Sequence, residues 1–403
     1  MQTATRWPLF LSLMLLAALL ASINWRYDYL DNGLPYNQND FAHYYVAARS
    51  VLVGADPYLV NLDSEYEKYR FSNDPKLKRP TNPPALVLLT VPLALLPPYQ
   101  AFVLWSTVQL LSLLAAVFIT TRIVLGRWEF SPAFMLLLLA LPLNPVLSHL
   151  YYGQTQMLML FLFTCGLYFV KDGRAAGAAL WGFATALKLF TFPAIVAAYK
   201  SSGKEGAFAF IAGFLAPYLL SFVLLGFSVN INFVSVALPD IAESAARTTG
   251  NKGLGYALWG TPQVWRGGIY YDSYSLISTV SACVVLLIYL AMAVRMRSGP
   301  GSAAAHITLA LCCSLLAAPT SWIHYYVLLL LPFTLYFLES APFIEALPKM
   351  AAAYLLLGII APINPGESQP AKMLSLWSGV AAALFYAALF YRRNSRKANG
   401  SRL

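Results

Sequence analysis

The stretch "YQAFVLWSTVQLLSLLAAVFITT", residues 99–121, contains no charged side chain. An α-helix rises 1.5 Å per residue, so a stretch of about 20 residues crosses the roughly 30 Å apolar core of a bilayer. This pattern predicts a transmembrane helix. Similar apolar stretches recur along the chain, at 7–24, 131–150, 154–170, 206–227, 275–294, 303–319, 323–338, 347–363 and 372–391. The sequence therefore predicts an all-α polytopic membrane protein.

The composition supports the same fold class. The 403 residues are 59% apolar and 11% charged, whereas soluble proteins carry roughly 25% charged residues. The net charge of +10 is spread through loops, which is typical of positive-inside bias and not of a nucleic-acid partner. All four cysteines fall inside apolar runs, so we expect neither a disulfide framework nor a cysteine zinc site.

Three regions of the apolar pattern are ambiguous. The first stretch, 7–24, is either a cleaved signal peptide or a retained span, and its poor cleavage motif favours the span. Residues 82–97 are short and proline-rich, which indicates an interfacial helix with Pro83 in its first turn. Residues 174–200 contain Lys188 and form either one long span or two short ones.

Basic loops set the expected topology. The tail 392–403 is basic, which places it in the cytoplasm. When the spans are counted back from this tail, the basic loops at 121–128 and 171–174 fall in the cytoplasm only if 174–200 forms two short spans. Lys188 then lies in a short turn that dips into the membrane. The result is a single domain, 1–403, with about twelve spans and both ends inside. Two long loops, 25–98 and 228–274, then lie outside.

Acidic residues follow this topology. Twelve of the 17 Asp and Glu residues fall in the expected outer loops, and none lies in the middle of a span. A proton-coupled transporter usually keeps a carboxylate at mid-membrane. The pattern therefore favours chemistry on one face of the membrane.

Asp40 is the first candidate for that chemistry. Residues 41–53 repeat apolar side chains at helical spacing, which predicts an amphipathic helix on the outer leaflet. Asp40 is either a cap of this helix or a general base, and a capping carboxylate has the fixed orientation that a base needs. His43 and Tyr44 are expected beside it on the helix surface.

Other candidates come from three further segments. Gln154 and Gln156, in "HLYYGQTQ", suit sugar hydroxyls or form a simple polar turn. Lys188 is either functional or a snorkelling lysine. His324, in "APTSWIHYY", is a titratable group or an ordinary interfacial residue. His149 and His306 have weaker claims.

A basic cluster precedes the interfacial helix in "KLKRP", residues 76–80. Lys78 and Arg79 belong to it, and such cations suit phosphate, although an ordinary solvated charge run has the same pattern. A base, phosphate-binding cations and a lipid-facing site together suggest group transfer from a lipid phosphate.

Five segments carry a family resemblance. They are "DFAHYYVAARSVLVGADPY", "NPPALVLLTVPLALLP", "GQTQMLMLFLFTCGLY", "GFATALKLFTFPAIVAAY" and "SWIHYYVLLLLP", in order over 40–332. The chain resembles the polyprenol-phosphate-mannose-dependent mannosyltransferases of glycosyltransferase family 87, in the GT-C superfamily. The resemblance implies a GT-C fold with two juxtamembrane helices in the first outer loop. It also implies transfer with inversion, with Asp40 as general base and Lys188 and His324 at the leaving phosphate.

Two departures from the family pattern bear on the acceptor and the sugar. In the second outer loop Asn251 survives, but Lys252 and Gly253 replace a polar pair. The histidine that the family has after His324 is Tyr325 here.

The sequence thus predicts a hexosyltransferase on the outer face of a bacterial cytoplasmic membrane. It would move a mannosyl or similar unit from a polyprenyl phosphate to a lipid or glycan. Gln154, His43, Tyr44 and Asn251 are candidate sugar or acceptor contacts. The sequence has no Asp-x-Asp motif, and we expect no metal or cofactor. The alternatives are a transporter or flippase for lipid-linked sugars, and a lipid-linked glycan polymerase or ligase.

Overall fold

The computed structural model describes residues 39–69, 71, 79–241, 251–266, 274–339, 354–356 and 369–399. These residues form helices and no strand; the only bridge among them pairs Asn251 with Trp322. The α-helices are α2 (Asn39–Leu52), α3 (Leu62–Tyr69), α4 (Pro84–Thr90), α5 (Pro98–Leu125), α6 (Phe130–Ala140), α7 (Asn144–Tyr152), α8 (Gln156–Lys171), α9 (Gly177–Leu187), α10 (Ala194–Leu224), α11 (Phe227–Asn232), α13 (Leu254–Arg266), α14 (Tyr274–Arg295), α15 (Ala303–Ala317), α16 (Leu330–Glu339) and α18 (Gln369–Asn399). The short 3₁₀ helices that matter below are η3 (Val91–Leu95), η4 (Leu189–Thr191), η6 (Pro300–Ser302) and η7 (Ile323–Leu329).

Four helical segments in the described residues are long and apolar enough to cross a membrane. They are α5, α10, α14 and the segment Pro300–Ala317 that joins η6 to α15. They confirm the helices predicted at 99–121, 206–227, 275–294 and 303–319. Twelve spans are not confirmed, since the number rises only to five if α6 and α7 form one span. The stretch 7–24 and most of 347–363 lie outside the described residues.

The span predicted over 131–150 is bent in the structure. Helices α6 and α7 meet at an angle of 74°. The chain leaves the first helix in the sequence "LPLNP", residues 141–145. Pro142 and Pro145 have no backbone N–H to donate, and Pro145 instead occupies the first turn of α7, where that donor is not needed.

Helix α2 exists as predicted, but it does not lie on a surface. Its residues 41–48 are all buried, because α3, α4 and η3 cover it. Tyr45 donates a hydrogen bond to the carbonyl of Leu96 at 2.9 Å, and Arg49 donates one to that of Ala94 at 3.1 Å. The expectation of an amphipathic surface helix is therefore wrong. The spacing of apolar residues along a helix does not show which neighbours pack on its polar side.

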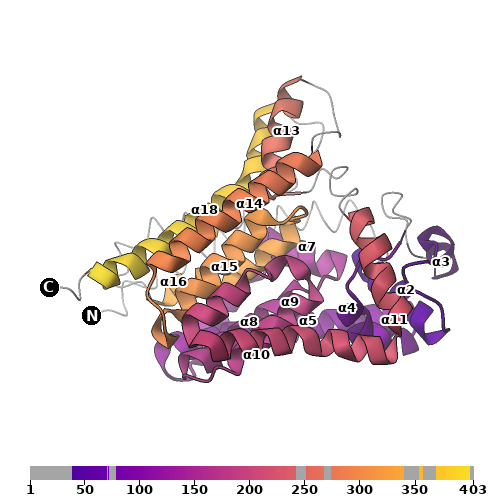
Figure 1. Cartoon of the computed structure of the whole chain (residues 1–403), viewed down its shortest axis with the longest axis horizontal. Helices are drawn as coiled ribbons and strands as arrows, with labels where there is room; N and C mark the ends of the chain where they lie inside the picture. The colour runs from indigo at the N-terminus through magenta and orange to yellow at the C-terminus, as the bar shows by residue number, and fades with distance from the viewer. Residues whose placement is uncertain are drawn as a thin grey trace.

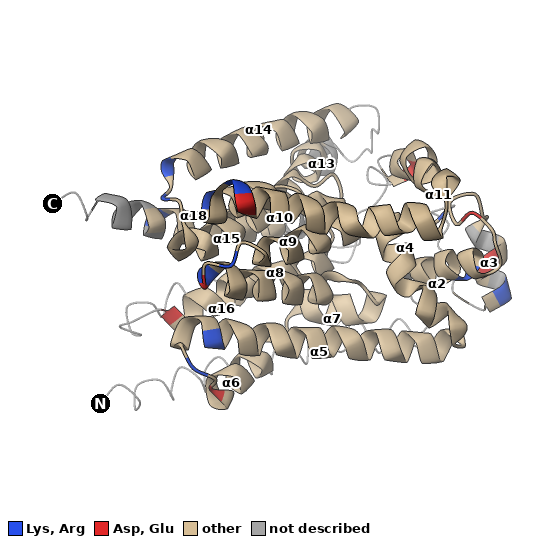
Figure 2. Ribbon diagram, turned by 60° about the horizontal axis from the view of Figure 1, so that its bottom comes forward, with Lys and Arg blue, Asp and Glu red and all other residues tan. Residues whose placement is uncertain are grey.

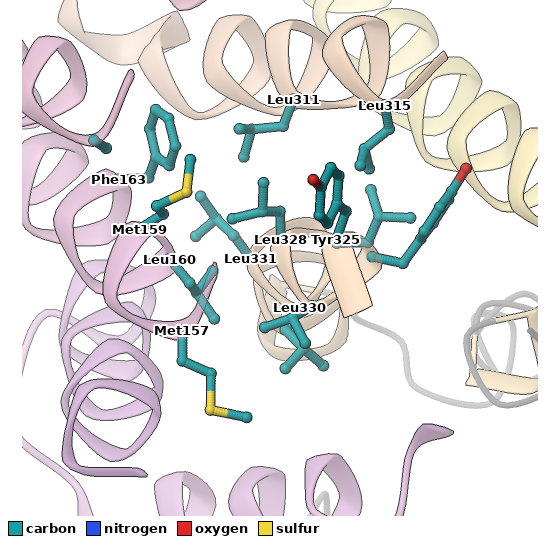
Figure 3. Packing of buried hydrophobic residues seen from close by; sticks show 14 of the residues in the cluster. Met157, Met159, Leu160, Phe163, Leu311, Leu315, Tyr325, Leu328, Leu330 and Leu331 are labelled. Atoms are coloured by element: carbon teal, nitrogen blue, oxygen red, sulfur yellow. The ribbon is translucent and has the colours of Figure 1, made fainter. Parts of the chain in front are cut away.

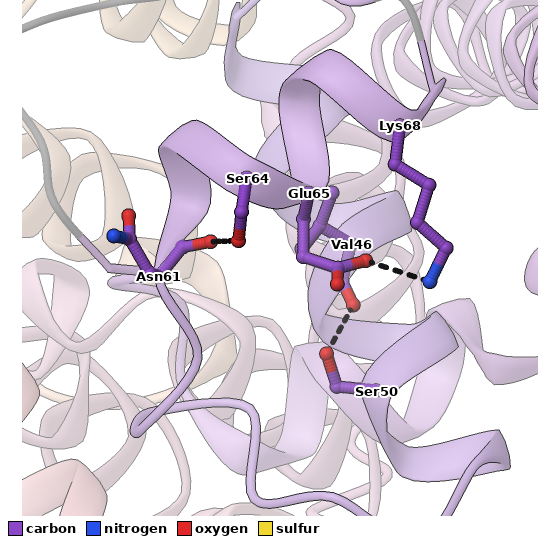
Figure 4. A network of polar contacts seen from close by, with 6 residues as sticks. All are labelled: Val46, Ser50, Asn61, Ser64, Glu65 and Lys68. Carbon is purple, nitrogen blue, oxygen red and sulfur yellow. Dashed lines mark hydrogen bonds and ion pairs between the residues drawn. The ribbon is translucent and has the colours of Figure 1, made fainter.

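Local polar contacts hold α2 and α3 in shape. Ser50 donates back to the carbonyl of Val46 in α2, and Lys68 pairs with Glu65 on the exposed side of α3 (Figure 4). The exposed pair contributes little to stability. The interfacial helix expected at 82–97 appears as α4 followed by η3, with Pro83 as N-cap and Pro84 in the first turn.

The region 174–200 breaks where it was predicted to break. Helix α9 ends at Leu187, and Lys188 has an extended backbone with φ −149° and ψ 111°. Hydrogen bonds between Thr185 and Thr191 close the break from either side. Helix α10 then runs to Leu224 and kinks at 202–203, so the second half of the region joins the next helix.

Helices α9 and α10 touch through glycine. A Cβ atom on Gly182 would lie 2.0 Å from the carbonyl oxygen of Phe210, and one on Gly213 would lie 2.0 Å from that of Ala179. Such small residues let two membrane helices approach closely.

Adding one methyl group here is expected to destabilise the protein. We predict that Gly182→Ala loses about 1–3 kcal/mol of stability, because the backbones must separate to admit the methyl group. Thermal unfolding in detergent measures this loss. Gly301→Ala is the control, since open space surrounds Gly301. Equal melting temperatures for the two variants would contradict the close contact.

The buried core lies where α8, α15 and η7 meet. Met159, Leu160 and Phe163 of α8 face Leu311 and Leu315 of α15 across the leucines of η7 and α16 (Figure 3). Tyr325 stands at the edge of this cluster. The core therefore fixes the position of η7, which carries His324.

The helices pack into a bundle (Figure 1), and charged residues gather at the ends of this bundle (Figure 2). At one end, the α8–α9 turn, the α10 kink and the α14–α15 loop surround one open cavity of about 490 Å³. These are three of the basic loops that were expected in the cytoplasm. At the other end, Asp56 accepts a hydrogen bond from Asn232 at 2.8 Å. The two long loops expected outside thus contact each other.

Candidate functional site

A tight turn between α7 and α8 forms the centre of the candidate site. Gly153 has φ +64°, and a Cβ atom there would lie 2.7 Å from the Cβ of Phe41. The indole of Trp105 donates a hydrogen bond to the carbonyl of Gly153 at 2.7 Å. Glycine therefore lets α2 approach the turn, and Trp105 fixes the backbone that presents Gln154.

Gln154 joins two of the predicted residues. Its carboxamide oxygen accepts a hydrogen bond from the hydroxyl of Tyr44 at 2.9 Å and another from the ammonium of Lys188 at 2.7 Å. Burial, and then the negative charge of Asp40, raise the pKa of Tyr44 well above its ordinary value. Tyr44 therefore stays protonated and can donate this bond.

Asp40 acts on the same group of residues. It lies in the first turn of α2, partly buried, and its charge interacts electrostatically with Tyr44, Lys188 and Tyr325. A carboxylate in the first turn also interacts favourably with the helix dipole. The two interpretations of Asp40, helix terminus and base, are thus compatible.

Lys188 has a defined environment. Besides Gln154, its ammonium donates to the hydroxyl of Tyr325 at 3.3 Å and lies 4.6 Å from the centre of that ring. Helix α8 begins at Gln156, directly after the turn, and its N-terminus carries partial positive charge. An ammonium and a helix N-terminus at one point can together hold an anion.

His324 lies on the neighbouring segment. Its ring contacts those of Tyr152 and Tyr325, with centroids 5.7 and 5.0 Å away. The ring is 3% exposed, and neither of its nitrogens has a hydrogen-bond partner in the part of the chain that the structure describes. Buried polar atoms are normally paired, so this imidazole is suited to a ligand that brings a donor and an acceptor.

A comparison with known families identifies the family of the chain. The family model of glycosyltransferase family 87 matches residues 81–319. The chain belongs to glycosyltransferase family 87. No curated protein and no solved structure matches the chain.

This family 87 glycosyltransferase is a membrane protein, as its apolar helices indicate. The matched segment contains Gln154, Lys188 and Asn251 but not Asp40 or His324. The contacts described above connect those two residues to the matched segment. The predicted family is confirmed.

Three predicted residues, His43, Arg79 and Asn251, lie apart from this cluster in the glycosyltransferase. His43 is buried and its ring packs against that of Tyr66 at 5.8 Å. Arg79 is partly buried in the bend before α4. Lys78 lies outside the described residues. Asn251 bonds to the hydroxyl of Tyr274 and to the backbone of residues 253, 319 and 321, which favours a structural role for its amide.

Sequence reasoning missed three contributions. Tyr325 was noted only as a departure from the family pattern, yet it contacts Lys188. Gly153 was quoted in a motif without a role. The pair His149 and Gln109 is buried, with 3.3 Å between Nε2 and Oε1, and Gln109 also accepts from the backbone N–H of Leu158 in α8. A glutamine inside an apolar span, as Gln109 is, was the available signal.

No metal-binding group was found: the described residues contain no cluster of three His, Cys, Asp or Glu side chains that could hold an ion. The expectation that the glycosyltransferase works without a metal stays a prediction. It is consistent with the chemistry of the cluster, in which Lys188 is the cation.

Lys252, which belongs to the departure from the family pattern in the second outer loop, is a buried lysine. It is 3% exposed, in a segment that donates from its backbone N–H to the carbonyl of Ser321. Burial lowers the pKa of Lys252 from 10.5 to about 8. Between these two values the unfolded chain binds more protons, so stability rises with pH there and is constant below.

We expect Lys252→Met to remove this pH dependence. The variant should be more stable than the wild type at pH 7 by about 3 kcal/mol, and this advantage should shrink as the pH rises from 8 to 10.5. Melting temperatures across that range measure it, with the exposed Lys204→Met as control. Parallel melting curves for wild type and Lys252→Met would contradict a lowered pKa.

Proposed function

We propose that this glycosyltransferase moves a mannosyl or similar hexosyl unit from a polyprenyl phosphate to a hydroxyl of a lipid or glycan acceptor. One observation carries the proposal: in a family 87 chain, Tyr44 of α2 and Lys188 at the break after α9 both donate to Gln154 in one tight turn, and Asp40 lies one helical turn before Tyr44. The carboxylate suits an acceptor hydroxyl, and the ammonium suits a leaving phosphate.

The reaction follows from these two groups. Asp40 takes the proton from the acceptor hydroxyl, whose oxygen attacks the anomeric carbon. The bond between that carbon and the phosphate oxygen breaks, and the polyprenyl phosphate leaves with the electron pair. Attack opposite to the leaving group inverts the configuration at the anomeric carbon.

The leaving phosphate gains negative charge, which needs stabilisation in the transition state. Lys188 supplies a full positive charge, and the N-terminus of α8 supplies a partial one. His324 supplies an N–H donor. Arg79 and Lys78 precede α4, and we assign them to the phosphate at headgroup height.

The remaining predicted residues are assigned to the sugar and the acceptor. Gln154 and Tyr44 are already hydrogen-bonded to each other, so they form one wall of the proposed site. His43 and Asn251 are kept as candidate contacts of the acceptor. His43 packs against Tyr66, and Asn251 bonds to the 319–321 backbone. These contacts favour a role of both residues in the shape of the site over direct contact with the acceptor.

The proposed architecture is a GT-C fold, with α2 and α4 as the two juxtamembrane helices. Helix α8 begins directly after the turn that holds Gln154 and ends at Lys171, beside the cavity between the three basic loops, so the proposed site and these loops lie at opposite ends of α8. Positive-inside bias places those loops in the cytoplasm. We therefore place the reaction on the external face of the cytoplasmic membrane.

A transfer assay tests the proposal. Purified protein in nanodiscs is incubated with radiolabelled polyprenyl-phosphate-mannose and membrane lipids, and the products are separated by thin-layer chromatography. We expect the label to move to a new lipid, with release of polyprenyl phosphate. Label that crosses the bilayer but stays on its carrier would instead show a flippase. Chains of increasing length would show a polymerase.

A further inference from the structure

Tyr325 contacts the ammonium of Lys188 in two ways. Its hydroxyl oxygen accepts a hydrogen bond from the ammonium at 3.3 Å, and its ring centre lies 4.6 Å from the same nitrogen. A cation near the face of an aromatic ring is attracted by the π electrons, and more strongly where water is excluded. One side chain therefore provides both an acceptor and a π surface for the same charge.

The ring of Tyr325 is itself held in place. It stacks on Phe190 with 4.8 Å between centroids and 13° between planes. Phe190 belongs to η4, two residues after Lys188, whereas Tyr325 belongs to η7. The stack therefore ties the helix break that carries Lys188 to the segment that carries His324.

The contact with Tyr325 uses one of the N–H donors of the Lys188 ammonium. An ammonium has three N–H groups, and Gln154 and Tyr325 each accept one of them. No third hydrogen bond from Lys188 is found within the described residues. The free lysine side chain has many rotamers, and fixing it before a ligand binds removes that entropic cost from binding.

We propose that Tyr325 is a positioning residue, which together with Gln154 fixes Lys188 so that its third N–H points to a phosphate oxygen of the donor. This inference rests on the proposed function and assigns a role to a residue that sequence comparison treats as a departure. Tyr325 does not contact the reacting atoms in this account; it acts through Lys188.

Two variants separate the hydroxyl from the ring. Tyr325→Phe keeps the stack on Phe190 and the π surface, and should raise the KM for the donor by about 3- to 10-fold. Tyr325→Leu loses both contacts and should raise it by about 30-fold or more. The KM for the acceptor should stay near the wild-type value in both variants.

Tyr326→Phe is the matched control. Tyr326 is the buried neighbour of Tyr325, and its hydroxyl donates to the carbonyl of Lys252 at 2.9 Å, away from Lys188. Loss of this hydroxyl should lower the melting temperature but leave the donor KM unchanged. An equal rise in donor KM for Tyr325→Phe and Tyr326→Phe would overturn the proposal.

A double-mutant cycle gives the decisive readout. Affinity for polyprenyl monophosphate alone is measured for wild type, Tyr325→Leu, Lys188→Met and the double variant. If Tyr325 acts through Lys188, adding Tyr325→Leu to the wild-type protein weakens the binding of polyprenyl monophosphate. Adding the same change to the Lys188→Met variant causes no further loss. Additive losses would show a merely structural role and overturn the inference.

The same measurement separates this inference from the proposed function. A wild type that binds polyprenyl monophosphate but transfers no sugar would contradict the function, while the cycle would still report on Tyr325. A wild type with no affinity for polyprenyl monophosphate would overturn both.

Discussion

The Asp40→Asn variant is expected to lose sugar transfer by about a thousandfold, because a positioned general base contributes between 10² and 10⁴ to the rate. Asparagine has nearly the same shape but cannot take a proton from the acceptor hydroxyl. Asp40 lies in the first turn of α2, where asparagine is also tolerated. We therefore expect the variant to fold and to bind polyprenyl phosphate with near wild-type affinity.

The measurement is single-turnover transfer of labelled sugar, alongside the melting temperature and the affinity for polyprenyl monophosphate. Asp172→Asn is the control, since Asp172 is exposed at the C-terminus of α8, at the end of the bundle with the basic loops. Full activity of Asp40→Asn would remove the carboxylate from the mechanism. A loss of folding in Asp40→Asn would instead show that the carboxylate serves the helix.

The Lys188→Met variant is expected to lose donor binding and transfer together, by about 100- to 1,000-fold in kcat/KM for the donor. Methionine keeps much of the apolar stem but removes the charge that stabilises the leaving phosphate. The ammonium forms two hydrogen bonds, to Gln154 and Tyr325. In the variant Gln154 keeps only the hydrogen bond from Tyr44, and the hydroxyl of Tyr325 loses this donor.

Loss of charge and loss of structure can be separated for Lys188. Lys188→Arg retains the positive charge, and we expect it to recover part of the activity at a higher KM, because the guanidinium is too large for the same contacts. Lys204→Met, on the exposed kink of α10, should behave as wild type. Unchanged donor kinetics in Lys188→Met would exclude this lysine from the phosphate site.

Much of the fold could be predicted from local sequence. The apolar stretches predicted the long helices α5, α10 and α14, since length and hydropathy are local properties. The break at Lys188 was also predicted, because basic loops on either side required an even number of crossings. The bend between α6 and α7 was missed, although Pro142 and Pro145 were visible in the stretch 131–150.

The burial of α2 was missed for a different reason. The spacing of apolar residues in 41–53 gives an amphipathic helix, and this pattern does not reveal which neighbours cover the remaining face. In the structure Tyr45 and Arg49 bond to the backbone of residues 94–96. A contact between segments about 45–50 residues apart does not change the spacing of apolar residues within either segment.

The amino-acid sequence by itself determined that this chain is a helical membrane protein, and the family motifs pointed to glycosyl transfer. Hydropathy and short motifs are read along the chain, so they need no knowledge of neighbours in space. Only the tertiary structure decided that Tyr44, Gln154, Lys188 and Tyr325 meet at one turn. These partners are separated by 34 to 137 residues, and helix packing alone brings them within hydrogen-bonding distance.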